Sequence, residues 1–120
     1  MKLAVTSQGR ELSSLVDTRF GRAKFFVIVD SETGQFSAVD NAQNLNAAQG
    51  AGIQSGGKVV ELGAEAVITG HVGPKAFVTL QAGGVKIYTG AAGTVADAVE
   101  QFKAGKLKQS SNADVEGHWV

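Results

Sequence analysis

AVITGHVGP, at residues 66–74, predicts a short buried strand that passes through a glycine-containing turn directly into a helix. Pro74 suits the first turn of that helix, because its missing N–H would have no partner there in any case. Apolar residues at positions 76, 77 and 80 then follow helical spacing, and Gly83-Gly84 ends the helix. A strand, a turn and a helix in this order are typical of α/β proteins with parallel strands.

The segments that follow continue this pattern. Residues 85–89 alternate between apolar and polar side chains, as a strand near a sheet edge does. Thr94 is expected to cap a third helix, and Asp97 stands three residues further on and completes a capping-box pattern. Gly105 is expected to end that helix.

The segments before residue 66 add a helix and three strands. Residues 50–63 are predicted to form a helix, and Gly56-Gly57 inside it is expected to let the helix approach the sheet closely. Residues 2–6 form a first strand. Residues 24–40 read as a hairpin, because the apolar run at 25–29 is followed by a four-residue turn and a further strand.

Together these elements predict an α/β fold with a mixed five-stranded sheet and helices on both of its faces. We expect the strand order 3-2-1-4-5, with strand 2 antiparallel to the others and strands 1 and 4 as parallel neighbours. This topology is ribonuclease-H-like. One domain is expected over residues 1–105. Residues 106–120 have no clear period and are expected to form a mobile C-terminal tail.

The charge balance excludes a broadly basic surface for nucleic acid. Lys plus Arg and Asp plus Glu each number 11 in 120 residues, so any positive patch must be local. The absence of cysteine excludes disulfides and fits a reducing compartment. No apolar run is long enough for a signal peptide or a membrane span. We therefore expect a soluble, cytoplasmic protein that binds neither nucleic acid nor membrane.

Three loops are expected at the carboxyl ends of the parallel strands, where ligands collect in such sheets. Two of them run directly into helix N-termini, which favour anions. Arginine and lysine would supply charge, the glycine turns would supply N–H donors, and Phe20 would form an apolar wall. The candidate binding residues are Arg19, Phe20, Gly21, Arg22, Gly70, His71, Val72, Gly73, Lys75, Gly90, Gly93 and Thr94.

Each of these residues also has an ordinary structural interpretation. Glycines are common in strand-to-helix turns, and surface arginines are usually solvated. A single histidine at a strand end is more often a surface residue than a ligand. His71 lies within a Gly-His-Val-Gly-Pro turn, however, and is a candidate metal ligand or hydrogen-bond donor. His118, beside Trp119 in the tail, is weaker evidence for a site.

Enzymatic chemistry has little support in the sequence. The first strand, residues 2–6, carries none of the carboxylates that ribonuclease H chemistry needs. There is no P-loop, no cysteine nucleophile and no nucleophile-elbow serine. We therefore expect a binding protein and not an enzyme.

Several motifs resemble those of a known family in sequence and in order. They are DTRFGRA at residues 17–23, GAGIQ at 50–54, AVITGHVGP at 66–74 followed by AF at 76–77, and GAAGTV at 90–95. Over residues 2–107 the chain resembles the dinitrogenase iron–molybdenum cofactor biosynthesis family. The resemblance implies a ribonuclease-H-like fold that carries metal–sulfur clusters or their precursors.

The resemblance also suggests the kind of cargo and how it is held. Small cysteine-free members of the family are known for non-covalent binding of a molybdenum–copper–sulfide cluster. Many cofactor carriers of the family have a histidine before the Phe-Gly pair, where this chain has Arg19. The arginine favours electrostatic binding of an anionic cluster that brings its own sulfur.

We therefore expect non-enzymatic binding or carriage of such a cluster, together with an unidentified protein partner. One alternative is a regulatory or protein-interaction domain with a generic oxyanion site. A second is a carrier of an iron–molybdenum cofactor precursor, and a third is a phosphoryl-transfer enzyme on the same scaffold.

Overall fold

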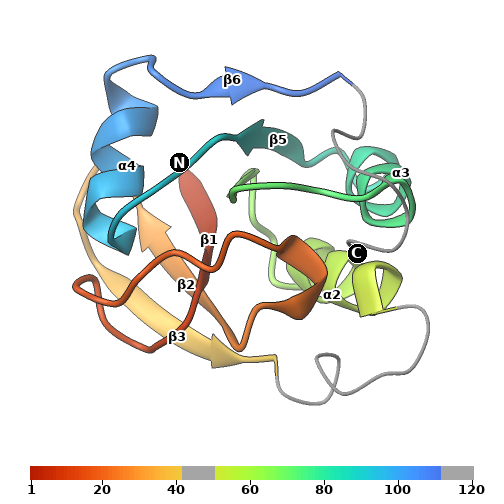
Figure 1. Cartoon of the computed structure of the whole chain (residues 1–120), viewed down its shortest axis with the longest axis horizontal. Helices are drawn as coiled ribbons and strands as arrows, with labels where there is room; N and C mark the ends of the chain where they lie inside the picture. Colours follow the sequence, from red (N-terminus) through yellow and green to blue (C-terminus); the bar gives the residue numbers. More distant parts are fainter. Residues whose placement is uncertain (42–50, 112–120) are drawn as a thin grey trace.

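The computed structural model describes residues 1–41 and 51–111 and contains one six-stranded sheet with helices against both faces (Figure 1). The strands are β1 (Lys2–Ser7), β2 (Phe25–Asp30), β3 (Phe36–Asp40), β4 (Ala66–Ile68), β5 (Lys86–Thr89) and β6 (Lys108–Gln109). The helices are the 3-10 helix η1 (Phe20–Arg22) and the α-helices α2 (Ala51–Glu61), α3 (Pro74–Ala82) and α4 (Val95–Lys103).

The sheet has the order β3-β2-β1-β4-β5-β6, which confirms the predicted order of the first five strands. β1 lies between β2 and β4. Leu3 pairs with Val29 of antiparallel β2 on one side and with Ala66 of parallel β4 on the other. β3 is antiparallel to β2, and β5 is parallel to β4, as the sequence predicted.

The prediction of five strands was wrong, because β6 adds a sixth. β6 pairs antiparallel with β5, with Tyr88 opposite Gln109, and the N–H of Ser110 donates to the carbonyl of Ile87 at 2.8 Å. A strand of two polar residues has no alternation from which it could be predicted. β5 is therefore covered at its outer side and is not the edge strand that its sequence suggested.

The C-terminal part of the predicted tail lies outside the described residues. The structure describes the chain up to residue 111, and β6 lies within the tail predicted over residues 106–120. The mobility of that tail stays a prediction, as does the domain boundary at residue 105. The helix predicted over residues 50–63 is observed from Ala51 to Glu61.

Helices cover both faces of the sheet, as predicted, and each face has its own apolar core. Strand residues alternate between the two faces: Ala4 of β1 belongs to the first core, whereas Leu3 and Val5 belong to the second. α2 and α3, on the right in Figure 1, cover the first face, and α4, on the left, covers the second. None of the helices described within residues 1–41 and 51–111 is both long and apolar enough to cross a lipid bilayer.

The predicted helix boundaries follow from local chemistry. α3 begins at Pro74, and the left-handed Gly84, with φ of +76°, follows its end. Thr94 and Asp97 form a complete capping box at the start of α4. The side chain of Thr94 accepts from the N–H of Asp97, and the carboxylate of Asp97 accepts from the N–H of Thr94.

The glycine pair in α2 has a different role from the one predicted. A Cβ on Gly56 would lie 3.1 Å from Cγ2 of Thr79, so this glycine lets α2 approach α3 and not the sheet. A Cβ on Gly57 would meet nothing within 4 Å. Only the first of the two glycines is therefore required by packing.

This difference predicts unequal effects on stability for two neighbouring substitutions. Gly57→Ala is expected to raise the free energy of unfolding by about 0.5–1 kcal/mol, because alanine is the better helix former and the site has room. Gly56→Ala is expected to gain less or to destabilise, because its methyl group would press on Thr79. Urea unfolding of both variants measures the difference, and an equal gain for both would contradict the close approach of α2 to α3.

Candidate functional site

The three loops expected at the carboxyl edge of the parallel strands are held together by backbone hydrogen bonds. The segment that follows β1 crosses this edge and pairs with the other two loops. His71 donates its N–H to Thr18 at 2.8 Å and accepts from the N–H of Phe20 at 3.2 Å. On the other side, the N–H of Val16 donates to Gly93 at 2.9 Å. Loops far apart in the sequence therefore form one continuous surface.

The first of these contacts is a parallel bridge between Arg19 and His71. Directly paired residues of neighbouring strands project their side chains to the same side of the backbone. Both residues are exposed. The bridge therefore brings the backbones of Arg19 and His71 side by side, from two loops that the sequence separates by about fifty residues, and their side chains leave the surface at neighbouring positions.

The N-terminus of α3 begins beside this bridge and has no side-chain cap. Its N-cap residue is Gly73, which has no side chain to accept a hydrogen bond, and Pro74 follows at the first helical position. The first N–H groups of a helix have no acceptor within the helix, and its dipole makes this end positive. Lys75 is exposed in the same turn and adds a full positive charge.

The N-terminus of α4 differs, because the protein itself satisfies its N–H groups. Their acceptors are the two side chains of the capping box and two carbonyls of the loop after β1. These bonds run from Thr94 N to Asp97 Oδ2 (3.0 Å), Val95 N to Ser14 O (2.9 Å), Ala96 N to Leu12 O (2.9 Å) and Asp97 N to Thr94 Oγ1 (3.1 Å). The N–H of Gly90 also donates internally, to Gly70 at 3.0 Å. The expectation that Gly90 and Thr94 offer N–H donors to a ligand is corrected by these bonds.

Two predicted binding residues have their side chains in the core. Phe20 and Val72 are each 1% exposed and belong to the core beneath α2 and α3. The ring of Phe20 lies 5.7 Å from that of Phe26 between centroids. Phe20 therefore anchors η1 from below and cannot form the expected apolar wall, and the side chain of Val72 is equally unable to contact a ligand at the surface. Gly21 is buried as well.

Gly70 is required by the contact between the loops. A Cβ at this position would lie 2.7 Å from the carbonyl oxygen of Thr18, closer than real contacts allow. The sequence interpretation assigned this glycine to a ligand. Its role in the structure is to let the segment after β1 lie against the loop after β4.

An acidic residue lies close to the cationic group. Oδ1 of Asp17 accepts the N–H of Arg19 at 3.1 Å. Burial raises the pKa of Asp17 above its ordinary value of 3.8, against the opposing effects of that hydrogen bond and of the charges on Arg19 and Lys24. The sequence interpretation gave no role to this carboxyl group, whose charge would oppose an anionic ligand.

The described residues suit a preassembled anion better than a bare metal ion. Within residues 1–41 and 51–111, no three histidine, cysteine, aspartate or glutamate side chains gather as a metal site would require. His71 can supply one nitrogen ligand at most. Cations and helix N–H groups, in contrast, bind an anion without covalent ligands.

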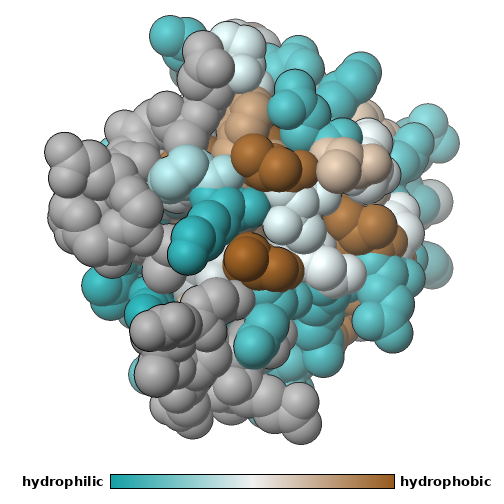
Figure 2. All heavy atoms as spheres, turned by 90° about the vertical axis from the view of Figure 1, so that its right-hand side faces the viewer, coloured by the Kyte–Doolittle hydropathy of each residue, from teal (hydrophilic) through white to brown (hydrophobic). Residues whose placement is uncertain are grey.

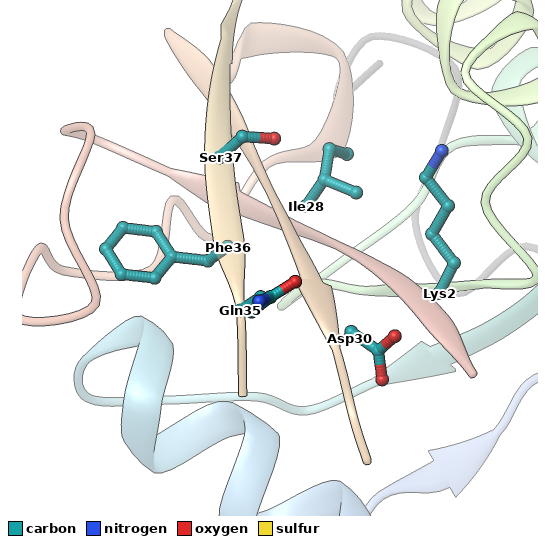
Figure 3. Close-up of a pocket in the computed structure, with 6 residues that line it drawn as sticks. All are labelled: Lys2, Ile28, Asp30, Gln35, Phe36 and Ser37. Atoms are coloured by element: carbon teal, nitrogen blue, oxygen red, sulfur yellow. The ribbon is translucent and has the colours of Figure 1, made fainter. Parts of the chain in front are cut away.

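The pocket of about 360 Å³ in Figure 3 lies at the opposite edge of the sheet, around the start of β1 and the turn between β2 and β3. Its charged groups have internal partners. Nζ of Lys2 donates to the carbonyl of Leu62 at 2.6 Å, and Oδ1 of Asp30 accepts the N–H of Glu32 at 2.8 Å. This pocket is therefore not a candidate anion site.

An apolar groove of about 330 Å³ adjoins the start of α3. Ile53 and Val78 line it and are 46% and 64% exposed, with Pro74 and Lys75 at one side. Figure 2 shows this side of the molecule, where hydrophobic side chains lie among hydrophilic ones. The positive N-terminus of α3 thus lies next to an apolar surface.

Comparison with solved structures identifies near relatives. The apo form of the orange protein from Desulfovibrio gigas has a TM-score of 0.92 and 40% sequence identity, over 95% of this chain and 96% of that one. A Thermotoga protein of the DUF35 family has a TM-score of 0.80 and 37% identity, over 95% and 98%. An uncharacterised protein of Methanocaldococcus jannaschii is 28% identical over 111 residues, 91% of each chain.

A family model provides the broader assignment. The model described as "Dinitrogenase iron-molybdenum cofactor" matches residues 1–105, which include every described loop of the site. The resemblance that the sequence motifs carried is therefore confirmed: the chain belongs to the dinitrogenase iron–molybdenum cofactor family.

Proposed function

We propose that this protein binds and carries an anionic metal–sulfur cluster without catalysing a reaction, and that the cluster is a molybdenum–copper sulfide. The observation that carries the proposal is the bridge that sets Arg19 beside His71 at the uncapped N-terminus of α3. The similarity to the orange protein supports the choice of cargo.

The binding energy would come from charge and from main-chain N–H groups. Arg19 and Lys75 are exposed, and Arg22 is half-buried at the end of η1. Guanidinium groups are weakly hydrated and present several donors in a fixed plane, so they suit a large anion. The positive N-terminus of α3, which has no side-chain cap at Gly73, would add to the attraction for that anion.

The absence of cysteine decides the kind of cluster that this site can hold. A cluster that needs thiolate ligands would find none in the chain. A thiomolybdate-type cluster supplies its own sulfide to copper, which prefers soft ligands. His71 would then act as a hydrogen-bond donor or as a single nitrogen ligand to the metal.

The family assignment favours a second cargo, a precursor of the iron–molybdenum cofactor. The same cations would hold it, and iron content distinguishes it from a molybdenum–copper cluster. Either cargo implies a partner protein that delivers or receives the cluster. The lack of cysteine agrees with a cytoplasmic location.

Reconstitution tests the proposal directly. Tetrathiomolybdate and a copper salt are added to the purified protein, which is then separated from small molecules by gel filtration. We expect strong visible absorbance and both metals to elute with the protein. Elution of colourless, metal-free protein would refute cluster binding, and iron in protein isolated gently from its native source would favour the second cargo.

The electrostatic mode predicts the effect of removing the two arginines. Arg19→Ala with Arg22→Ala is expected to weaken cluster retention by about tenfold at low ionic strength, because charge-assisted bonds are lost. Added salt should weaken cluster retention more in the wild type than in the variant, because salt screens the attraction of the two arginine charges and the variant lacks them. Lys86→Ala is the control, since Lys86 is exposed at the opposite edge of the sheet. Equal salt dependence in all three proteins would reject the electrostatic mode.

The raised pKa of Asp17 predicts the direction in which the stability of the fold changes with pH. Because burial raises the pKa of Asp17, the stability that this group contributes is fully present below pH 3.8 and is lost as the pH rises through the folded-state pKa. Asp17→Asn is therefore expected to be more stable than the wild type at neutral pH, and the difference should disappear in acid.

The same substitution is expected to strengthen cluster retention at neutral pH, because it removes a negative charge beside Arg19. Retention by the wild type should rise as the pH falls through the pKa of Asp17, and the variant should lack this rise. Glu61→Gln, which removes a charge at the far end of α2, serves as the control. Weaker retention in Asp17→Asn would contradict an anionic cargo at this position.

A further inference from the structure

We infer that Thr6 and Thr69 are positioning residues that set the register between Arg19 and His71. The inference rests on the proposed function, because it assigns a binding role to two side chains that no ligand could touch. Both are fully buried, at the ends of the parallel neighbours β1 and β4. Neither threonine is among the binding residues predicted from the sequence.

Thr6 binds both backbone groups of Asp17. Its carbonyl accepts the N–H of Asp17 at 2.9 Å, and its hydroxyl lies 2.7 Å from the carbonyl oxygen of Asp17. The same hydroxyl lies 2.8 Å from the hydroxyl of Thr69. Asp17 is thereby fixed two residues before Arg19.

The hydroxyl of Thr6 connects the two segments. Its single proton has two acceptors within reach, the carbonyl oxygen of Asp17 at 2.7 Å and the hydroxyl oxygen of Thr69 at 2.8 Å. The result is a buried chain of hydrogen-bonding groups that runs through Thr69, Thr6 and Asp17, and replacing either hydroxyl by a methyl group breaks it.

Thr69 extends this chain to the remaining loops. Its carbonyl accepts the N–H of Ala91, from the loop after β5, at 3.1 Å. It also lies two residues before His71. The two threonines therefore fix Asp17 and Thr69 relative to each other, and the bridge between Arg19 and His71 spans the two segments that continue from them.

Substitution by valine tests this role, because valine keeps the shape and removes the hydroxyl. Thr6→Val and Thr69→Val are each expected to raise the dissociation constant of the reconstituted molybdenum–copper cluster by about tenfold, because Thr69→Val removes one buried hydrogen bond and Thr6→Val removes the contacts of its hydroxyl with both Asp17 and Thr69. Thr89→Val is the matched control. Thr89 is a buried threonine at the end of β5, but its hydroxyl pairs with Ser110 and not with a binding loop. The Thr89→Val variant should be less stable than the wild type but should retain the cluster equally well.

A double-substitution cycle separates positioning from general stability. If Thr6 acts through Arg19, Thr6→Val should weaken retention much less in an Arg19→Ala background. An equal loss in both backgrounds would overturn the inference. Thr6→Ser keeps the hydroxyl and should retain the cluster as the wild type does. If Thr6→Val does not fold, Thr69→Val is combined with Arg19→Ala in the same way.

Amide hydrogen exchange of the protein without cluster gives a readout that does not depend on binding. The amides of Phe20 and His71, which form the bridge, should exchange faster in Thr69→Val than in Thr89→Val. Unchanged exchange at both amides would refute the positioning role even if the cluster binds. If the wild type binds no cluster but the two amides still exchange faster in Thr69→Val than in Thr89→Val, the proposed function is refuted. The structural coupling between the threonines and the bridge would still hold.

Discussion

The backbone pairing of the segment after β1 with the loops after β4 and β5 is the constraint on which the surface of this protein depends. Without it, the end of the sheet would carry three independent turns. With it, residues 16–20 lie between His71 and Gly93, and the ring of Phe20 anchors them in the core. Arg19, the exposed cation of this stretch, therefore lies on a well-packed base.

Most of the fold could be predicted from the sequence, because its elements are long enough to have a period or begin with a distinctive residue. The five main strands, Pro74 at the start of α3 and the capping box at Thr94 belong to this group. β6 could not be predicted, because two polar residues carry no period and their pairing depends on the position of β5. Gly56 illustrates a similar limit, since the sequence indicated a close approach but not its partner.

The site could be predicted only as a set of loops. Their common location followed from the topology, and the proximity of Arg19 and His71 agrees with it. The burial of Phe20 and the internal bonds at the start of α4 could not be foreseen, because both depend on where the segment after β1 lies. An aromatic residue between two arginines looks the same in sequence whether it faces a ligand or the core.

β6 also determines how sheets of this kind could associate. An unpaired edge strand is a template on which another chain can add, and fibres grow when both edges of a sheet are open. Here β6 covers β5 and offers only two residues of its own, whereas β3 has five. Addition through β3 would join two copies and then have no comparable edge on which to continue, so the short last strand opposes open-ended polymerisation.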